Sequence, residues 1–255
     1  MTITDLQEHL DELNSKYNTS SFIADDPISI PHAYTLKQDI EITGLWTAVL
    51  SWGQRKTIIN KSRELFHLMD GAPYDFIMNH KEKDRKAFLS FKHRTFQPED
   101  TLYFLHFLQH FYREHSSLES CFFPRKNMSV KEGLLHFRKQ FFSLNAHLKR
   151  TEKHISTPAS KSSCKRLNMF LRWMVRADDN QVDFGIWQQI TPAQLMIPLD
   201  VHVFRVARNL GLLNRERADW VAVEELTTRL RQFDPTDPVK YDFALFNLGI
   251  NKDLP

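Results

Sequence analysis

Glycine, cysteine and long apolar runs are all scarce in this chain. Only 7 of its 255 residues are glycine, which disfavours a β architecture built on many tight turns. Its 2 cysteines, Cys121 and Cys164, lie far apart and indicate free thiols in a reducing cytoplasm. No apolar run approaches the roughly 18 residues of a transmembrane helix, and the acidic first residues do not resemble a secretion signal. We therefore expect a cytoplasmic, all-α protein that has no membrane partner.

Positive charge is concentrated in the middle of the sequence. Residues 1–50 hold 2 Lys and Arg against 8 Asp and Glu, residues 51–176 hold 24 against 11, and residues 177–255 hold 8 against 12. The net charge of +3 therefore conceals a basic central block between two acidic ends. Such a block is typical of proteins that bind a polyanion, although basic residues that only solvate several helices are the alternative. We expect a nucleic acid as the partner.

Residues 160–213 contain two amphipathic helices, and the first begins close to Lys165. Apolar residues recur along it at i, i+3, i+4, i+7 and i+8, namely Leu167, Phe170, Leu171, Met174 and Val175. We expect Ser162 or Ser163 to cap this helix. Because a helix N-terminus carries partial positive charge, the pKa of Lys165 should lie below that of a free lysine, and a neutral amine is a nucleophile. The alternative is a solvated lysine beside Arg166.

The second helix of this segment begins after Asp200. Its apolar face consists of Val201, Phe204 and Ala207. Pro198 cannot extend an earlier helix, so Asp200 falls at the N-cap, and Gly211 suits the end of the helix. A capping carboxylate is kept ionised by backbone N–H groups, which is what a catalytic base or a charge stabiliser requires. A purely structural cap is the alternative reading of Asp200.

Several segments resemble a bacterial family of unknown function, DUF2400. The matching segments are LWTAVLSWGQRKTI, CKRLNMFLRWMVR, DFGIW, PLDVHVFRVARNLGLL and DPVKYDFALFNLGI. The string IPLDVHVFRVARNLGLL is also similar to the PVDTHV segment of the helix-hairpin-helix DNA glycosylases. Among those enzymes, the archaeal 8-oxoguanine glycosylases are the most similar in the spacing of their lysine and aspartate.

The glycosylase resemblance implies a two-lobed helical fold with a cleft between the lobes, which we place at 1–150 and 151–255. It implies that Asp200 is the catalytic aspartate and that Lys165 forms a Schiff base with the sugar. Candidate nucleic-acid contacts lie in the early lobe and around the hairpin and Asp200, namely Trp52, Gln54, Arg55, Lys161, Ser163, Arg166 and His202. Ordinary core packing is the alternative for Trp52. The first hypothesis is therefore a DNA glycosylase and AP lyase that removes a damaged base.

The stretch PASKSSC departs from the glycosylase pattern, because the usual LPGVG hairpin has glycines that let backbone amides approach a phosphate. This departure favours a second hypothesis, a non-catalytic nucleic-acid-binding protein on a glycosylase-like scaffold. A third hypothesis is cysteine chemistry at Cys164, because a helix N-terminus also favours a thiolate.

The rest of the sequence predicts supporting helices. We expect helices over residues 3–17 and 219–233, the latter capped by Asp219. A last helix should begin with Asp237 as N-cap and Pro238 at its first position, and should end at Gly249. Tyr241 and Asp242 lie in its first turn and are structural, or border the cleft.

No cofactor is expected. His106 and His110 have the i, i+4 spacing of a shared metal site, but no HExxH pattern surrounds them, so we expect no metal. Neither of the glycine-rich nucleotide-binding motifs occurs, and two cysteines are too few for a four-cysteine iron–sulfur cluster.

Overall fold

The computed structural model describes residues 2–251, and its regular secondary structure is entirely helical over that range. Pairing of the β type is limited, within these residues, to two isolated bridges, His93 with Phe96 and Ser162 with Asp219. The predicted all-α class is confirmed.

The chain forms two compact units. Among the described residues, the first unit comprises 2–24, 126–132 and 157–251, and the second comprises 25–125 and 133–156. The division falls inside α8 (Val130–Phe141). The first unit is therefore assembled from three pieces of the chain, and these boundaries differ from the lobes expected from the sequence.

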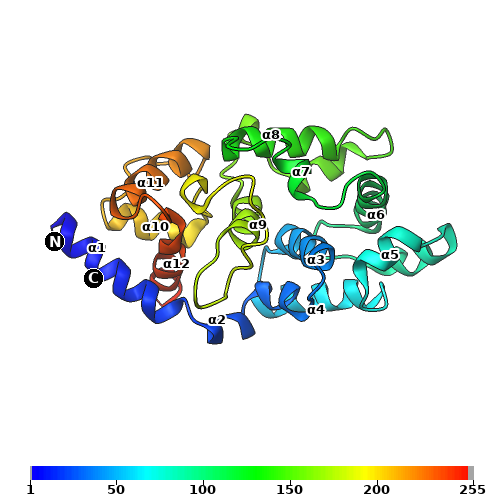
Figure 1. The fold of residues 1–255 in the computed structure, drawn as a ribbon, viewed down its shortest axis with the longest axis horizontal. Coiled ribbons are helices and arrows are strands. Elements are labelled where there is room, and N and C mark those ends of the chain that lie inside the picture. Colours follow the sequence, from blue (N-terminus) through cyan, green and yellow to red (C-terminus); the bar gives the residue numbers. More distant parts are fainter. Residues whose placement is uncertain (1, 252–255) are drawn as a thin grey trace. The chain divides into compact units, whose positions relative to one another are not determined.

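The first unit contains the two helices that the sequence singled out. Its elements are α1 (Ile3–Tyr17), α2 (Ser20–Ala24), η5 (Pro158–Ser160), α9 (Lys165–Val175), η6 (Pro192–Gln194), α10 (Val201–Asn209), α11 (Trp220–Phe233), η7 (Pro238–Tyr241) and α12 (Asp242–Asn251). The α12 helix packs against both α1 and α10, so the two ends of the described chain meet in one unit (Figure 1). The predicted helix 3–17 is confirmed by α1, and the Asp219 side chain caps α11 as expected.

The end of the last helix differs from the prediction. Gly249 lies inside α12, not at its end, because the close approach of α10 requires glycine at this position. A Cβ atom added to Gly249 would lie 2.7 Å from the Cβ of His202. Asp237 does occupy the N-cap of η7, but its side chain makes no capping hydrogen bond and instead pairs with Arg176 at 2.8 Å.

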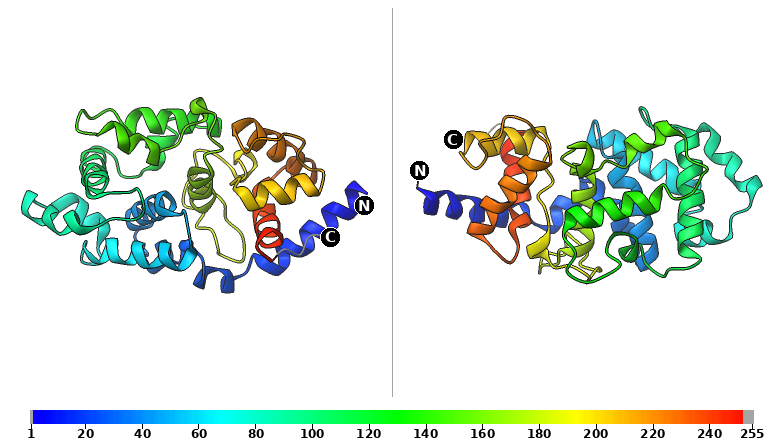
Figure 2. Two further views of the ribbon diagram at one scale, coloured as in Figure 1. Left: turned by 180° about the vertical axis from the view of Figure 1, so that it is seen from behind. Right: turned by 90° about the horizontal axis from the view of Figure 1, so that it is seen from above.

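The second unit is a set of helices (Figure 2). Its core is rich in aromatic side chains. Its elements are η1 (Pro27–Ser29), η2 (Pro31–Ala33), α3 (Lys37–Leu50), α4 (Arg55–His67), α5 (Pro73–Asn79), η3 (Glu82–Ser90), α6 (Pro98–Tyr112), α7 (Glu119–Phe122) and η4 (Lys149–His154), with the later part of α8. Phe104 is at the centre, with ring centroids 5.3 Å from Trp46, 5.4 Å from Phe96 and 4.7 Å from Phe141. Such pairs add favourable ring contacts to the burial of apolar area.

A buried carboxylate fixes the chain after α6 in the second unit. Glu41 of α3 is fully buried. It accepts hydrogen bonds from the Tyr112 hydroxyl at 2.9 Å, the Ser117 hydroxyl at 2.5 Å and the Leu118 N–H at 3.0 Å. A buried carboxylate needs such donors because desolvation of an unpaired charge is costly.

Candidate active site

The predicted nucleophile, Lys165, is the first residue of α9. The N-cap is Cys164, which has a left-handed backbone (φ 51°) and makes no side-chain capping bond, so the predicted serine cap is wrong. The Ser162 hydroxyl instead accepts from the Cys164 N–H, one residue before the helix starts, at 3.1 Å. Lys165 is half-buried, and no described residue lies within hydrogen-bond or ion-pair distance of its Nζ atom. The Lys165 amine therefore makes no hydrogen bond or ion pair with the described part of the protein.

The turn before α9 is tied to the start of α10. The Ser163 hydroxyl donates to the carbonyl of Leu199 at 3.1 Å, and the Asn168 side chain donates to the Ser163 carbonyl at 3.1 Å. Ser163 lies two residues before Lys165, and Leu199 lies one residue before Asp200. This hydrogen bond therefore brings together the two segments that carry the predicted catalytic residues.

The turn contains two residues in the left-handed backbone conformation that glycine adopts most easily, and neither of them is glycine. Lys161 and Cys164 both have positive φ, at 61° and 51°. The Lys161 carbonyl accepts a hydrogen bond from the Trp220 N–H at 3.3 Å. Left-handed non-glycine residues cost roughly 1–2 kcal/mol each, so the surrounding contacts must hold this conformation.

Asp200 is the N-cap of α10, as the sequence predicted. Its Oδ1 accepts from the N–H groups of His202 at 2.8 Å and Val203 at 2.9 Å. No described residue hydrogen-bonds or pairs with Oδ2, so one oxygen caps the helix while the other has no partner within the protein. Gly211 follows the helix with φ 71° and confirms the predicted C-terminal stop.

Lys165 and Asp200 both act electrostatically on a third residue, Asp242. Asp242 begins α12, is buried, and pairs with the guanidinium of Arg172. Burial raises the pKa of Asp242 to about 6, and the negative charges of Asp200 and Asp183 add to this rise. The positive charges of Arg172 and Lys165 oppose it. A carboxyl group with this pKa exchanges a proton near neutral pH.

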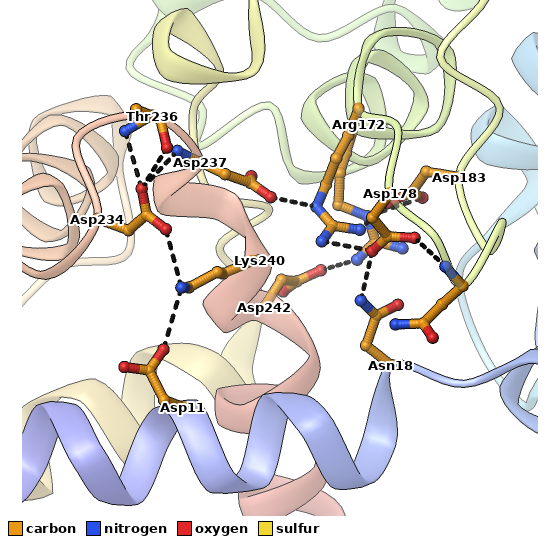
Figure 3. A network of polar contacts seen from close by, with 12 residues as sticks. Asp11, Asn18, Arg172, Asp178, Asp183, Asp234, Thr236, Asp237, Lys240 and Asp242 are labelled. Atoms are coloured by element: carbon orange, nitrogen blue, oxygen red, sulfur yellow. Dashed lines mark hydrogen bonds and ion pairs between the residues drawn. The ribbon is translucent and has the colours of Figure 1, made fainter.

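Asp242 belongs to a buried network that joins α9 to the start of η7 and α12 (Figure 3). Arg172 Nε also lies 3.2 Å from Asp183, and Arg176 contacts Asp183 at 3.1 Å, Asp178 at 2.7 Å and Asp237 at 2.8 Å. Both guanidinium groups are buried. Because breaking a buried ion pair leaves an uncompensated charge, the network holds its elements firmly in register.

From the sequence, Asp242 was interpreted as a structural residue or as a neighbour of the cleft, and no catalytic role was assigned to it. Its pairing with Arg172 joins residues that are 70 positions apart, which no local pattern can reveal. A weak signal was the presence of charged residues within apolar segments, with two arginines in RWMVRADD and two aspartates in DPVKYD.

The other candidate contacts of the first unit differ in their surroundings. Burial lowers the pKa of the half-buried Arg166 guanidinium, with the nearby Cys164 opposing this effect. Lys161 is exposed. The Nδ1 atom of His202 is buried and has no hydrogen-bond partner, and its ring lies 6.5 Å edge-on from Phe246. Cys164 is buried, and its Sγ lies 3.5 Å from the Ser162 carbonyl.

Trp52, Gln54 and Arg55 lie together in the second unit, at the start of α4. Gln54 is the N-cap but makes no side-chain capping bond. The guanidinium of Arg94 lies over the Trp52 ring at 4.6 Å, and Arg55 Nη2 lies 3.6 Å from Asp26. The site thus combines an aromatic ring and cations at one helix N-terminus.

The starts of α4 and α9 share one property. Among the longer described helices, these two have neither a side-chain cap nor an acidic residue in the first turn. Each instead begins with two cations, Arg55 and Lys56 in α4, and Lys165 and Arg166 in α9. Cations at the positive end of a helix dipole are unfavourable unless an anion binds there.

A surface hollow of about 510 Å³ lies elsewhere in the second unit, beside η1, η2 and the end of α4. Its polar lining includes Tyr34, Arg63, His67 and Asp70, and Phe66 contributes an aromatic wall. None of the residues predicted from the sequence lines it.

No group of three or more His, Cys, Asp or Glu side chains in this range is arranged to hold a metal ion. Likewise, none of the helices described is both long enough and apolar enough to cross a bilayer.

Comparison with known proteins matched one family. The family model described as "Protein of unknown function (DUF2400)" covers residues 26–251. Searches of curated proteins and of solved structures each returned no match to this chain.

Proposed function

The chain belongs to the DUF2400 family, and we propose that it is a DNA repair enzyme with DNA glycosylase and AP lyase activity. Lys165 is the nucleophile and Asp200 is the charge-stabilising carboxylate. The observation that carries this proposal is the hydrogen bond from Ser163 to Leu199, because it joins the segments of these two residues. The groups proposed to react, Lys165 Nζ and Asp200 Oδ2, belong to the two segments that this hydrogen bond joins.

The two side chains suit complementary roles. Lys165 Nζ has no partner among the described residues, so it is available to attack carbon. Asp200 is held by its capping bonds through Oδ1, which leaves Oδ2 to stabilise positive charge on a sugar.

The proposed reaction proceeds on an extruded nucleotide. The neutral amine of Lys165 attacks the anomeric carbon, and the glycosidic C–N bond breaks as the base leaves with the bonding electrons. The sugar ring then opens to give a Schiff base between Lys165 and C1′. Removal of a C2′ proton allows β-elimination of the 3′ phosphate, which cleaves the strand.

The cationic starts of α4 and α9 support DNA as the substrate. Each offers a helix N-terminus without an acidic residue in its first turn. Phosphates bind at helix N-termini.

Borohydride trapping tests the proposal. Labelled duplexes that carry an abasic site, 8-oxoguanine, uracil or an alkylated base are incubated with the protein and reduced. We expect a covalent adduct with the wild type that is lost in Lys165→Gln and retained in Lys161→Gln, which removes the same charge from the exposed turn. Asp200→Asn should abolish base release while DNA binding persists. No adduct on any duplex would refute the lyase activity.

A second candidate function is non-catalytic nucleic-acid binding. It is favoured by the turn before α9, where Lys161 and Cys164 hold the left-handed conformations that glycine would adopt more easily. This function predicts that the logarithm of the dissociation constant rises steeply with the logarithm of salt concentration. It also predicts no adduct and no base release on any of the duplexes above.

A further inference from the structure

The surface hollow of about 510 Å³ in the second unit has no part in the proposed reaction. It is lined by residues of η1 and η2 and by the last turn of α4 with the turn that follows. Ile30 and Phe66 are buried and contribute apolar lining. The volume falls within the range of about 300–1,000 Å³ that is typical of small-molecule sites.

The turn after α4 gives the hollow a preformed wall. Asp70 and Gly71 both have left-handed backbones, with φ of 55° and 68°. The Gly71 N–H donates to the Phe66 carbonyl and the Asp70 N–H to the His67 carbonyl, each at 3.1 Å. A Cβ atom added to Gly71 would meet no other described segment within 4 Å, so this side of the turn is open. The helix itself therefore fixes the wall.

The polar side chains of the hollow have no polar partners within the described protein. The hydroxyl oxygen of Ser29 is buried and makes no hydrogen bond there. Four further lining side chains likewise form no hydrogen bond or ion pair with a described residue, namely Tyr34, Arg63, His67 and Asp70. Polar groups of folded proteins are usually satisfied where they are buried, so this set suits a polar ligand.

Hydrogen-bond donors predominate in this set. Arg63 and His67 are four residues apart and so lie on the same side of α4. The guanidinium carries five N–H donors, and the imidazole and the two hydroxyls add others. Burial raises the pKa of Tyr34, so its hydroxyl remains protonated and able to donate. A guanidinium among several donors matches a phosphate group, which carries negative charge and several acceptor oxygens.

The apolar part of the lining indicates a ligand larger than phosphate. The half-buried Tyr34 ring meets the Phe66 ring edge-on, with centroids 6.5 Å apart. Ile30 and Ala33 add aliphatic surface. An inorganic phosphate would contact only the polar side chains and would leave most of the volume to water. A ligand with an apolar ring would cover the remaining lining.

We propose that this hollow binds a phosphomonoester whose body carries an apolar ring, which is the chemistry of a nucleoside monophosphate. Arg63 and His67 hold the phosphate, and the hydroxyls of Ser29 and Tyr34 donate to its oxygens. Asp70 accepts a hydrogen bond from a donor group on the body of the ligand. The site is independent of the proposed lyase, because none of its residues takes part in that reaction.

Titration of the full chain with AMP, without DNA, tests the proposal. Isothermal titration calorimetry should show saturable binding with a Kd below about 1 mM. Amide chemical shifts of the ¹⁵N-labelled protein should change mainly in residues 29–34 and 63–71. Adenosine lacks the phosphate and inorganic phosphate lacks the ring, so each should bind at least about tenfold more weakly than AMP.

Two variants assign the contacts. Arg63→Gln removes the cation from an exposed position, and we expect AMP to bind about 10–100-fold more weakly. Arg113→Gln is the matched control, because this exposed arginine of the same unit does not line the hollow, and it should bind AMP like the wild type. Ser29→Ala should weaken binding about 2–10-fold without lowering the thermal unfolding midpoint, because its hydroxyl has no internal hydrogen bond to lose.

Three results would each overturn the proposal. One is the absence of saturable AMP binding, and another is equal affinity for AMP in Arg63→Gln and Arg113→Gln. The third is binding of adenosine or of inorganic phosphate as tight as that of AMP, which would show that the phosphate or the ring is not recognised. The borohydride experiment is read separately, so failure of the lyase and failure of this site are distinguishable.

Discussion

The hydroxyl of Ser163 donates a 3.1 Å hydrogen bond to the carbonyl of Leu199. This contact joins the turn before α9 to the residue before Asp200, over a sequence separation of 36 residues. The two residues of greatest chemical interest are each adjacent to it. The relative placement of Lys165 and Asp200 therefore depends on a side chain that has no chemical role in the proposed reaction.

Replacing Ser163 by alanine should loosen the start of α10. The loss of one hydrogen bond should lower the free energy of unfolding by about 1 kcal/mol. Hydrogen exchange of the amides in residues 199–206 should accelerate more than exchange elsewhere in the unit. Ser160→Ala is the control, because its hydroxyl bonds locally to the Thr157 carbonyl. Equal exchange in both variants would show that the Ser163 bond does not hold α10.

Gly249→Ala should destabilise the first unit, although alanine is the better helix former. The added Cβ would lie 2.7 Å from the Cβ of His202 and 3.2 Å from its backbone, so α10 and α12 would have to separate. We expect a loss of about 1–3 kcal/mol, measured by urea unfolding. The control Ile250→Ala changes an exposed neighbour and should alter stability by less than about 0.5 kcal/mol. A Gly249→Ala protein as stable as the wild type would contradict the close helix contact.

Glu41→Gln should destabilise the second unit by about 2 kcal/mol. Tyr112, Ser117 and Leu118 all donate to the Glu41 carboxylate, and an amide group presents donors of its own to some of them. Thermal unfolding measures the effect. Glu64→Gln is the control, because its pair with Lys61 is on the surface and contributes little. An unchanged thermal unfolding midpoint in Glu41→Gln would mean that the three donors do not require a charged acceptor at this position.

The pKa of Asp242 predicts a pH-dependent stability. Folding raises the pKa of the Asp242 carboxyl group from 3.8 to about 6. As the pH rises, Asp242 therefore ionises in the unfolded protein before it ionises in the folded protein. The folded state therefore loses stability between about pH 4 and 6, by at most about 3 kcal/mol. Asp242→Asn cannot ionise, so the stability of the wild type minus that of the variant should fall over this range in urea titrations.

Asp100 provides a control of opposite sign for that experiment. Its burial raises the pKa, but hydrogen bonds from His154, Thr151 and the Gln97 N–H outweigh burial and leave the pKa below 3.8. Its stabilising contribution is therefore present above that pH and is lost as the pH falls through the folded pKa. The stability of the wild type minus that of Asp100→Asn should fall with decreasing pH. Parallel curves for both variants would contradict these assignments.

Local patterns predicted much of the fold. Asp200 and Asp219 were identified as helix caps, and Gly211 as a helix stop, because these choices depend on a few neighbouring backbone atoms. The start of α9 was predicted correctly, but its serine cap was not, because the N-cap is Cys164, which adopts a backbone conformation that its residue type disfavours. Only contacts from outside the turn can impose such a conformation.

Local sequence patterns could not predict contacts between segments that are far apart in the sequence. Glycine is a residue type that often ends helices, yet Gly249 lies inside α12. Its small size is needed there because α10, which lies 40 or more residues earlier in the sequence, packs closely against it. The pairing of Arg172 with Asp242 could not be predicted from the sequence either. Lys165 and Asp200 were identified by resemblance to a family, and their roles in catalysis remain a prediction.

The placement of α1 constrains the order in which the protein can fold during synthesis. Asp11 pairs with Lys240 at 3.0 Å, Gln7 donates to the Phe233 carbonyl at 3.1 Å, and Asn18 bonds to Asp178. The α1 helix therefore finds these partners only after segments that lie 160 or more residues later have been made. The second unit is complete once residue 156 has emerged, so it can fold while the first unit is still unfinished. The first unit, which holds Lys165, can be completed only after α12 has been made.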